Sequence, residues 1–484
     1  GATEIVYGEE PGTYEREVSQ TIKETYAFYN NNMNHERCHD GDENNPVKLV
    51  SKVGYTLYHP NDLPFDPNTW KQLAHPKNKH QKKKGTVQQK NVHMDDDSSS
   101  LGCRHFDLVD TSPDRFKGMC RIMGDFRNAV RGSTSVRTPL EAPKCLVKPQ
   151  SCKGLDVGSI PSLEELMDPL LKAEIPILGM DQMTIENIVK SAIQERDKKK
   201  TNDLDDEECQ YCGENAALKR LDYFIDQGYA AVANRSQADV SNNDSSRLSI
   251  HFSLGTLSPR TVYWKAHEAG EDCKWLKSHL EMRDFFLYTA FCAGKRLFRP
   301  QGLPLGKHPR EVKWRNPSDD ETYWRRWATG QTHLPLVDAA MKELMLTGYC
   351  SNRVRQNSTS VLTKDMQIDW RIGAEWFQFL LQDHCVGANY GNWLYFSGVG
   401  PDPKNRHFRT VSQSIRYDPK GSYVKKWLPA LNEVPNMEAI FRPWDFHISG
   451  FESPIVDPKT QFTWQDLQRL EEKGKLIQED EIQE

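Results

Sequence analysis

The sequence contains no long hydrophobic run. None of its stretches approaches the roughly 18 consecutive apolar residues that a membrane-spanning helix requires, and its mean hydropathy is −0.74. We therefore expect no membrane partner. An excess of one charge is also missing, because 63 Lys and Arg residues stand against 68 Asp and Glu residues, for a net charge of −5. Any contact with nucleic acid must therefore come from a local basic surface.

Cysteine is sparse. The 11 cysteines among 484 residues are too few and too unevenly spaced for a disulfide framework, which favours mostly free thiols in a reducing compartment. Cys209 and Cys212 form one CxxC pair, but no second pair has the spacing of a zinc site, so we expect no metal. The sequence begins Gly1-Ala2 without an initiator Met, so the localisation is open among plastid, mitochondrion and nucleus.

The chain is too long for one hydrophobic core, and its patterns indicate an α/β part followed by an all-α part. Near the N-terminus, two short apolar runs at 5–7 and 47–50 flank a segment in which Val18, Ile22 and Tyr26 recur every four residues. This is the pattern of strand, helix and strand, with Val18, Ile22 and Tyr26 on one face of an amphipathic helix. A parallel sheet needs more strands than these two, so we expect an incomplete Rossmann-like domain over 1–133.

Polar segments separate the expected domains. Residues 76–120 hold a lysine cluster and an acidic cluster with few apolar residues, which predicts a disordered insertion within the first domain. The lysines could contact nucleic acid, although a solvated loop is the simpler interpretation. We expect a linker and helical connector over 134–208 and an acidic tail over 451–484.

Residues 209–450 carry helical periodicity. Trp370, Ala374, Phe377 and Leu381 recur at the spacing of one buried helical face. Leu336, Ala340 and Leu344 do the same, ahead of a glycine at 348 that can end a helix. The sequence therefore predicts a large helical domain here.

Three segments of the helical domain could bind an anion or a cofactor. Residues 244–249, Asp-Ser-Ser-Arg-Leu-Ser, place hydroxyls and a cation before a helix start, as in a phosphate-binding nest, although serines also cap ordinary helices. Asn352, Arg355 and Gln356 share one helical face with Arg353 turned elsewhere, which suits an anionic ligand or structural salt bridges. Residues 383–393 offer a carboxylate, two amides and an aromatic in an expected glycine-bearing loop.

The same region resembles the FAD-binding domain of cryptochrome DASH, within the photolyase and cryptochrome family. The resemblance runs nearly continuously from about 209 to 430, and the end of the family's α/β antenna domain is matched at 56–65. The matching motifs are Gly213-Glu214-Asn215-Ala216-Ala217-Leu218, Leu257-Ser258-Pro259-Arg260, Leu336-Val337-Asp338-Ala339, Ser351-Asn352-Arg353, Trp370-Arg371-Ile372-Gly373-Ala374-Glu375-Trp376-Phe377, Asn389-Tyr390-Gly391-Asn392-Trp393 and Tyr417-Asp418-Pro419-Lys420-Gly421.

The resemblance implies FAD as cofactor and assigns residues to it. Arg355 and Asp383 match an ion pair against the isoalloxazine ring, and Asn389 matches the residue facing flavin N5. A guanidinium there favours a reduced, anionic flavin. The full cofactor-binding set is Ser245, Ser246, Arg247, Leu248, Ser249, Arg283, Asn352, Arg355, Asp383, Cys385 and Asn389, in which the serines, Leu248 and Arg283 hold the phosphates.

The implied reaction is light-driven repair of cyclobutane pyrimidine dimers in single-stranded DNA. Trp393, Trp370 and Trp314 match the tryptophan chain that passes electrons from the surface to the flavin, although each could be an ordinary core aromatic. These three and Asn389 are the catalytic candidates. The residues expected to meet the lesion strand are His279, Met282, Arg353, Gln356 and Tyr395.

Several positions depart from the family pattern. His279 stands where the family has a glutamate that hydrogen-bonds the dimer, Met282 where it has a tryptophan, and Cys385 where it has a second aspartate. The first antenna strands and their Asp-Leu-Arg motif are absent, so we expect no bound folate. Three interpretations stay open: a photolyase-type lyase, an FAD photoreceptor without repair and with an unidentified signalling partner, and a fragmentary product that does not fold stably.

Overall fold

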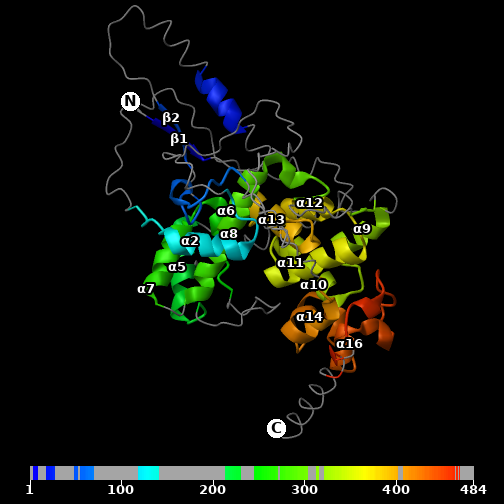
Figure 1. The fold of residues 1–484 in the computed structure, drawn as a ribbon. Helices are drawn as coiled ribbons and strands as arrows, with labels where there is room; N and C mark the ends of the chain where they lie inside the picture. The colour runs from blue at the N-terminus through cyan, green and yellow to red at the C-terminus, as the bar shows by residue number, and fades with distance from the viewer. Residues whose placement is uncertain are drawn as a thin grey trace, which may run out of the picture.

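The computed structural model describes residues 4–8, 18–27, 48–52, 55–69, 118–140, 213–230, 245–270, 273–303, 312–315, 321–401 and 407–463, with 465, 466 and 468. Most of these residues are helical (Figure 1). No helix within these ranges is long and apolar enough to cross a membrane. Most of the insertion expected at 76–120 and most of the connector expected at 134–208 lie outside them.

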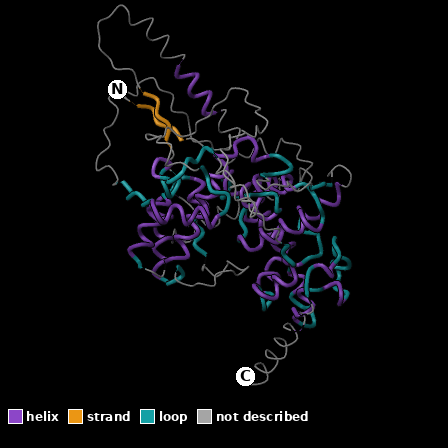
Figure 2. The backbone as a smooth tube through the Cα atoms, in the orientation of Figure 1, coloured by secondary structure: helices purple, strands orange, loops and turns teal. Residues whose placement is uncertain are grey.

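The N-terminal strands pair as the sequence predicts. Strand β1 (Glu4–Gly8) runs parallel to β2 (Lys48–Lys52), with Ile5 opposite Leu49 (Figure 2). Residues 18–27 between them are helical, so the order strand, helix, strand is confirmed. Of the three residues expected on one face of this helix, Ile22 and Tyr26 are half-buried and Val18 is 40% exposed, while Ser19 is buried.

The insertion is shorter than predicted at its C-terminal end. Met119 and Cys120 are buried, and the Met119 N–H donates to the Thr69 carbonyl. They join the core formed by residues around Leu57 and Phe65, which explains why this end is ordered.

Helices make up the rest of the described chain, and their arrangement follows two hydrophobic cores. The core around Leu57 includes side chains of α2, α5, α7 and α8. The second core includes side chains of α9 to α16. In Figure 1, α14 and α16 lie below the other helices of this core. The helices are α2 (Met123–Ser133), α5 (Gly213–Asp226), α6 (Ser249–Leu254), α7 (Pro259–Glu268), α8 (Lys274–Ala293), α9 (Glu321–Ala328), α10 (Pro335–Thr347), α11 (Asn352–Ser360), α12 (Trp370–Leu380), α13 (Val386–Ser397), α14 (Thr410–Tyr417), α15 (Ser422–Trp427) and α16 (Met437–Phe441). Helix α8 contributes side chains to both cores.

Local sequence sets the ends of two central helices. Helix α10 begins at Pro335, which needs no N–H partner there, and ends at Gly348, whose φ of +65° is left-handed. Helix α12 begins after Asp369, whose side chain accepts from the Arg371 N–H. The predicted faces of both helices are confirmed, because the residues that define them are buried: Leu336, Ala340, Leu344, Trp370, Ala374, Phe377 and Leu381.

Of the loop expected at 383–393, residues 383–385 precede a helix, and the rest belongs to helix α13, which begins at Val386. Its glycines serve close packing rather than a turn. A Cβ at Gly391 would lie 2.6 Å from Phe286 Cδ1 of α8, and one at Gly387 would lie 3.0 Å from Leu287 Cα. The missing side chains let the two helices approach each other closely.

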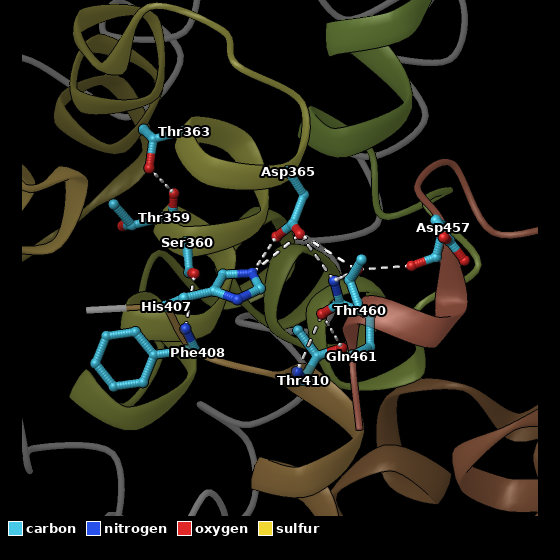
Figure 3. Close-up of polar contacts among 10 residues, drawn as sticks. All are labelled: Thr359, Ser360, Thr363, Asp365, His407, Phe408, Thr410, Asp457, Thr460 and Gln461. Atoms are coloured by element: carbon cyan, nitrogen blue, oxygen red, sulfur yellow. Dashed lines mark hydrogen bonds and ion pairs between the residues drawn. The ribbon is translucent and has the colours of Figure 1, made fainter. Parts of the chain in front are cut away.

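The region expected to be an acidic tail is packed over residues 451–463 (Figure 3). Gln461 is fully buried, and its Nε2 donates to Asp365 Oδ1 at 3.0 Å. Asp365 ends a π-helical turn, η8 (Val361–Asp365), and also lies 3.0 Å from His407 Nε2. The Thr410 N–H donates to Gln461 Oε1 at 3.2 Å. These bonds fasten the segment to the helical domain, so the predicted tail is wrong for residues 451–463.

One buried carboxylate joins the segment at 55–65 to helix α8. Asp284 is fully buried and accepts from the Leu57 N–H at 2.9 Å and the Tyr58 N–H at 2.8 Å. Burial raises the pKa of Asp284 to about 7, against the two N–H donors and Arg283, which favour the ionised form.

Asp284→Asn tests this junction through pH. The folded carboxyl keeps its proton up to a pKa of about 7, whereas the unfolded carboxyl releases it near pH 4. The free energy of unfolding of the wild type should therefore fall relative to that of Asp284→Asn as pH rises from about 4 to about 7, by on the order of 2–4 kcal/mol. Urea denaturation across this window measures the difference. The prediction fails if the stability of the wild type instead rises relative to that of Asp284→Asn as pH increases, because that result would mean that the folded protein holds Asp284 ionised over this pH range.

Candidate functional site

A cavity of about 600 Å³ opens between α6, α8, α11, α12 and α13, within the size range of sites for small molecules and cofactors. Most of the residues selected from the sequence line it: Ser245, Ser246, Arg247, Leu248, Ser249, His279, Met282, Arg283, Asn352, Arg353, Arg355, Gln356, Asp383, Cys385, Asn389 and Trp393. Trp370, Trp314 and Tyr395 lie outside its lining. The structure thus gathers side chains from segments more than 140 residues apart around one space.

The hydroxyl-rich segment forms one wall of the cavity. Arg247 has a left-handed φ of +51° and is followed by Leu248 with a right-handed φ of −77°. Such alternation turns successive N–H groups toward one side, as in an anion-binding nest. Arg220 holds the segment by donating to the carbonyls of Ser245 and Ser246. Sequence reasoning missed Arg220, which lies in α5 beyond the motif at Gly213–Leu218.

A buried ion pair also lines the cavity, and Arg247 of the first wall and Arg355 of this pair both lie over the Tyr349 ring, at 5.8 and 5.5 Å from its centroid. Arg355 Nη2 contacts Asp383 Oδ2 at 3.0 Å and Oδ1 at 3.2 Å, and its Nε donates to the Cys350 carbonyl at 2.8 Å. Desolvation opposes the charge of Arg355, but attraction to Asp383 outweighs it, so the pKa of Arg355 lies above its usual value. The Asp383 side chain is only 4% exposed. Both charges are therefore fixed in place.

Arg353 also lines the cavity, contrary to the expectation that it points elsewhere. Its Nη1 donates to Gln356 Oε1 at 3.0 Å, and its guanidinium lies 4.1 Å from the centroid of the Tyr417 ring. This bond across one helical turn and the ring of α14 hold the side chain toward the cavity. The cavity lining carries more positive than negative charge. It includes four arginines, Arg247, Arg283, Arg353 and Arg355, but only one carboxylate, that of Asp383. The cavity thus suits an anionic ligand.

Two polar groups are available to such a ligand. Asn389 donates its Nδ2 to the Ala374 carbonyl at 2.9 Å, which leaves its Oδ1 as an acceptor at the cavity wall. The Ser351 side chain lines the cavity and is buried, and its Oγ finds no hydrogen-bond partner among the described residues. A buried hydroxyl of this kind is costly unless a ligand or water satisfies it.

Of the three tryptophans expected to carry electrons, one lines the cavity and the other two lie together outside its lining. Trp393 lines the cavity, and Gly373 makes room for it, because a Cβ there would lie 2.1 Å from the Trp393 ring. Trp370 and Trp314 lie together, since both indole N–H groups donate to the Pro300 carbonyl, at 3.1 and 2.9 Å. Trp314 is half-buried, at the outer end of this group.

Trp327 is an aromatic neighbour that sequence reasoning missed. Its ring centroid lies 6.1 Å from that of Trp393, and Phe377 packs against both rings. Trp327 is fully buried in α9. The one sequence signal for its burial is that Trp324 and Trp327 stand three residues apart, as on one face of a helix.

A second pocket of about 270 Å³ adjoins the cavity and shares Met282, Arg353 and Gln356 with it. Tyr395 lines this pocket, so the residues expected to meet DNA lie around two adjoining spaces. Thr289 lines it too, and its buried Oγ1 has no partner among the described side chains and backbone. Within the described ranges, no group of three His, Cys, Asp or Glu residues could hold a metal, and Cys209 and Cys212 lie outside those ranges.

Comparison with known proteins agrees with this geometry. Residues 275–465 match the family model described as the FAD binding domain of DNA photolyase. The chain is 31% identical over 465 residues to a cryptochrome DASH of Danio rerio, covering 93% of this chain and 69% of that protein. It is 41% identical over 241 residues to one of Synechocystis, covering 48% of each chain. Measured against these two relatives, the chain spans between about half and two thirds of their length.

Solved structures show the same fold. A Synechocystis cryptochrome superposes with a TM-score of 0.65 at 25% identity, covering 98% of this chain and 79% of that one. A class III photolyase of Agrobacterium tumefaciens gives a TM-score of 0.61 at 20% identity, covering 97% and 79%. The cofactor of the helical domain is FAD, as the match of residues 275–465 to the FAD binding domain of DNA photolyase indicates. The residues present fit this cofactor. The four lining arginines and the anion-binding nest suit its phosphates, and the buried Ser351 hydroxyl, which has no partner among the described residues, suits a polar group of the ligand.

Arg355→Gln tests the buried ion pair. The change leaves Asp383 buried without its cation, which should cost roughly 3–5 kcal/mol of the free energy of unfolding. The matched control is Arg371→Gln, because Arg371 pairs with Asp369 but is 38% exposed, and exposed pairs contribute at most about 1 kcal/mol. Chemical denaturation of both variants measures the losses. If both variants lose the same free energy of unfolding, the buried Arg355–Asp383 pair does not stabilise the fold more than an exposed pair does.

Proposed function

Because the chain belongs to the cryptochrome DASH family, we propose that this blue-light flavoprotein repairs cyclobutane pyrimidine dimers in single-stranded DNA. The observation that carries the proposal is a single cavity lined by the Arg355–Asp383 pair, Asn389 and Trp393, which shares lining residues with the pocket of Tyr395. In this proposal, the residues assigned to electron supply and those assigned to DNA would meet at the cofactor site.

The nest and the arginines would hold the FAD phosphates. Ser245, Ser246, Arg247, Leu248 and Ser249 supply hydroxyls, N–H groups and a cation at one wall. Arg283, on α8, adds a second guanidinium. Asn352 and Cys385 would border the cofactor from the first turn of α11 and the residue that precedes α13.

The ion pair and Asn389 would act on the flavin ring. When bound and reduced, FAD excited by blue light supplies one electron that splits the dimer and then returns. The Arg355 guanidinium favours negative charge on a neighbouring ring. Asn389 presents Oδ1, because its Nδ2 is bonded to Ala374, so it would accept from a protonated ring nitrogen.

The tryptophans would connect the cavity to the protein exterior. Trp393 lines the cavity, and the buried Trp370 shares the Pro300 carbonyl with Trp314, which is half-buried. Oxidation of a neutral indole is easier when a nearby aromatic or carbonyl stabilises the positive charge. We assign electron supply to these three residues.

The DNA surface would comprise His279, Met282, Arg353, Gln356 and Tyr395. All five border the cavity or its adjoining pocket. A base must leave its stack to enter such a space, and this costs least in a single strand, which has no pairing to break.

The domain division follows the same proposal. We assign β1, β2 and the described residues up to 133 to an incomplete Rossmann-like α/β antenna domain, residues 134–208 to a connector and residues 209–450 to the FAD-binding domain. Residues 451–463 are added to the latter because they pack against it. The proposal includes no antenna folate.

The second candidate is an FAD photoreceptor without repair. His279 and Met282 favour it, because neither supplies the carboxylate or the flat stacking surface that the family pattern places there. Both candidate functions require FAD and the three tryptophans. Only a measurement of dimer repair distinguishes between them.

Trp393→Phe should slow photoreduction of the bound FAD at least about tenfold, because phenylalanine keeps the packing but is much harder to oxidise. The control is Trp264→Phe, since Trp264 lies in α7 and its indole N–H donates to the Arg137 carbonyl, outside the cavity lining. Flavin absorbance under blue light with a thiol reductant gives the rate. An unchanged rate in Trp393→Phe would remove this residue from the electron path.

The double change His279→Glu with Met282→Trp should raise dimer repair in single-stranded DNA by roughly tenfold, because it restores a carboxylate and a stacking surface. His267→Glu, at an exposed position of α7, controls for the added charge. Loss of dimers from an irradiated oligonucleotide under blue light is the measurement. No repair by either form, with FAD bound, would favour the photoreceptor.

A further inference from the structure

A second series of tryptophans leads away from the cavity into α9. Trp327 lies edge to face with Trp393, with ring centroids 6.1 Å apart and ring planes at 74°. Phe377 contacts both rings, stacked on Trp327 at 6.1 Å and edge-on to Trp393 at 5.2 Å. Trp393 and Phe377 line the cavity, whereas Trp327 lies behind them, outside its lining. Trp327 is thus the next oxidisable ring beyond Trp393 in this direction.

Trp324 continues the series toward the surface. It precedes Trp327 by three residues in α9, a spacing that places two side chains on one helical face with Cβ atoms about 5–6 Å apart. Trp327 is fully buried, whereas Trp324 is half-buried. The Trp324 ring also meets the buried Trp376 ring of α12, with centroids 6.3 Å apart. The series therefore begins at the cavity wall and ends at a residue that solvent reaches.

The surroundings of Trp327 favour a positive charge on its indole. Its indole N–H donates to the Ser358 carbonyl at 2.9 Å, and the partial negative charge of a carbonyl oxygen attracts a cation. The stacked Phe377 ring adds the attraction between an aromatic face and a positive charge. Trp370 has the corresponding bond to the Pro300 carbonyl. The two indoles are therefore alike in the contact that stabilises their oxidised forms.

We propose that Trp327 and Trp324 form a second route of electron supply that branches from Trp393. The inference rests on the proposed photoreduction of FAD. After Trp393 has lost one electron to the excited flavin, Trp327 reduces Trp393 and is itself oxidised, and Trp324 then reduces Trp327. A thiol in solution reduces Trp324, and the oxidised thiols lose their protons and pair as a disulfide. One electron thus moves from the thiol to the flavin, and no bond of the protein breaks.

Two routes that share only Trp393 should be redundant beyond it. In the full, FAD-loaded chain, Trp370→Phe alone should slow photoreduction under blue light with a thiol by less than about threefold, because Trp327 still supplies electrons. Trp370→Phe combined with Trp327→Phe or with Trp324→Phe should slow it at least about tenfold, as expected for Trp393→Phe. Trp370→Phe with Trp264→Phe is the matched control, because Trp264 lies in α7 outside the cavity lining.

Two further readouts separate electron supply from a structural role. The affinity for FAD, from fluorescence titration of the FAD-free chain, should be unchanged in Trp327→Phe and Trp324→Phe. A light flash should leave a long-lived tryptophan radical absorbance in Trp370→Phe, which the added Trp327→Phe abolishes. Because Trp324 is half-buried, Trp324→Phe tests the route even where the change at the buried Trp327 weakens FAD binding.

The outcomes distinguish this inference from the proposed function. If Trp370→Phe alone stops photoreduction as fully as Trp393→Phe does, or if Trp327→Phe and Trp324→Phe add nothing to it, the second route is overturned and the proposed function stands. If the FAD-loaded wild type is not photoreduced at all, both are overturned.

Discussion

The close packing of α8 against α13 is the constraint on which the site depends. Gly387 and Gly391 of α13 leave no side chain between the helices, so the backbone of α13 lies against Leu287 and Phe286 of α8. This contact brings His279, Met282 and Arg283 from one helix to the same cavity as Asn389 and Trp393 from the other. A methyl group at Gly391 would meet the Phe286 ring at 2.6 Å, and one at Gly387 would press on the α8 backbone at 3.0 Å, so either would push the two helices apart locally. Helix α8 also belongs to both hydrophobic cores and holds the segment at 55–65 through Asp284.

The helices and their ends were predictable from local sequence. Pro335 and Gly348 mark α10, and the recurring apolar residues of α12 are all buried. The pairing of Arg355 with Asp383 was implied by the resemblance rather than by spacing, and the structure places the two side chains in contact. These features depend on a few neighbouring residues or on motifs that occur together, which is why sequence reasoning reached them.

The errors share a physical cause. Glycines at 387 and 391 were interpreted as loop formers, but a glycine inside a helix can equally mark a close approach, and only the partner helix distinguishes the two. The direction of Arg353 depends on Gln356 and on Tyr417, which lies 64 residues away in sequence. Trp327 and Arg220 act through contacts with distant segments. Periodicity along one element carries no information about such partners.

The central claim is that the cavity binds FAD in a form that light can reduce. An absorption spectrum of the purified chain, recorded before and after blue light with a thiol reductant, tests it most directly. We expect flavin bands in the dark sample that bleach on illumination. A folded chain that carries no flavin, even after incubation with FAD, would contradict the account.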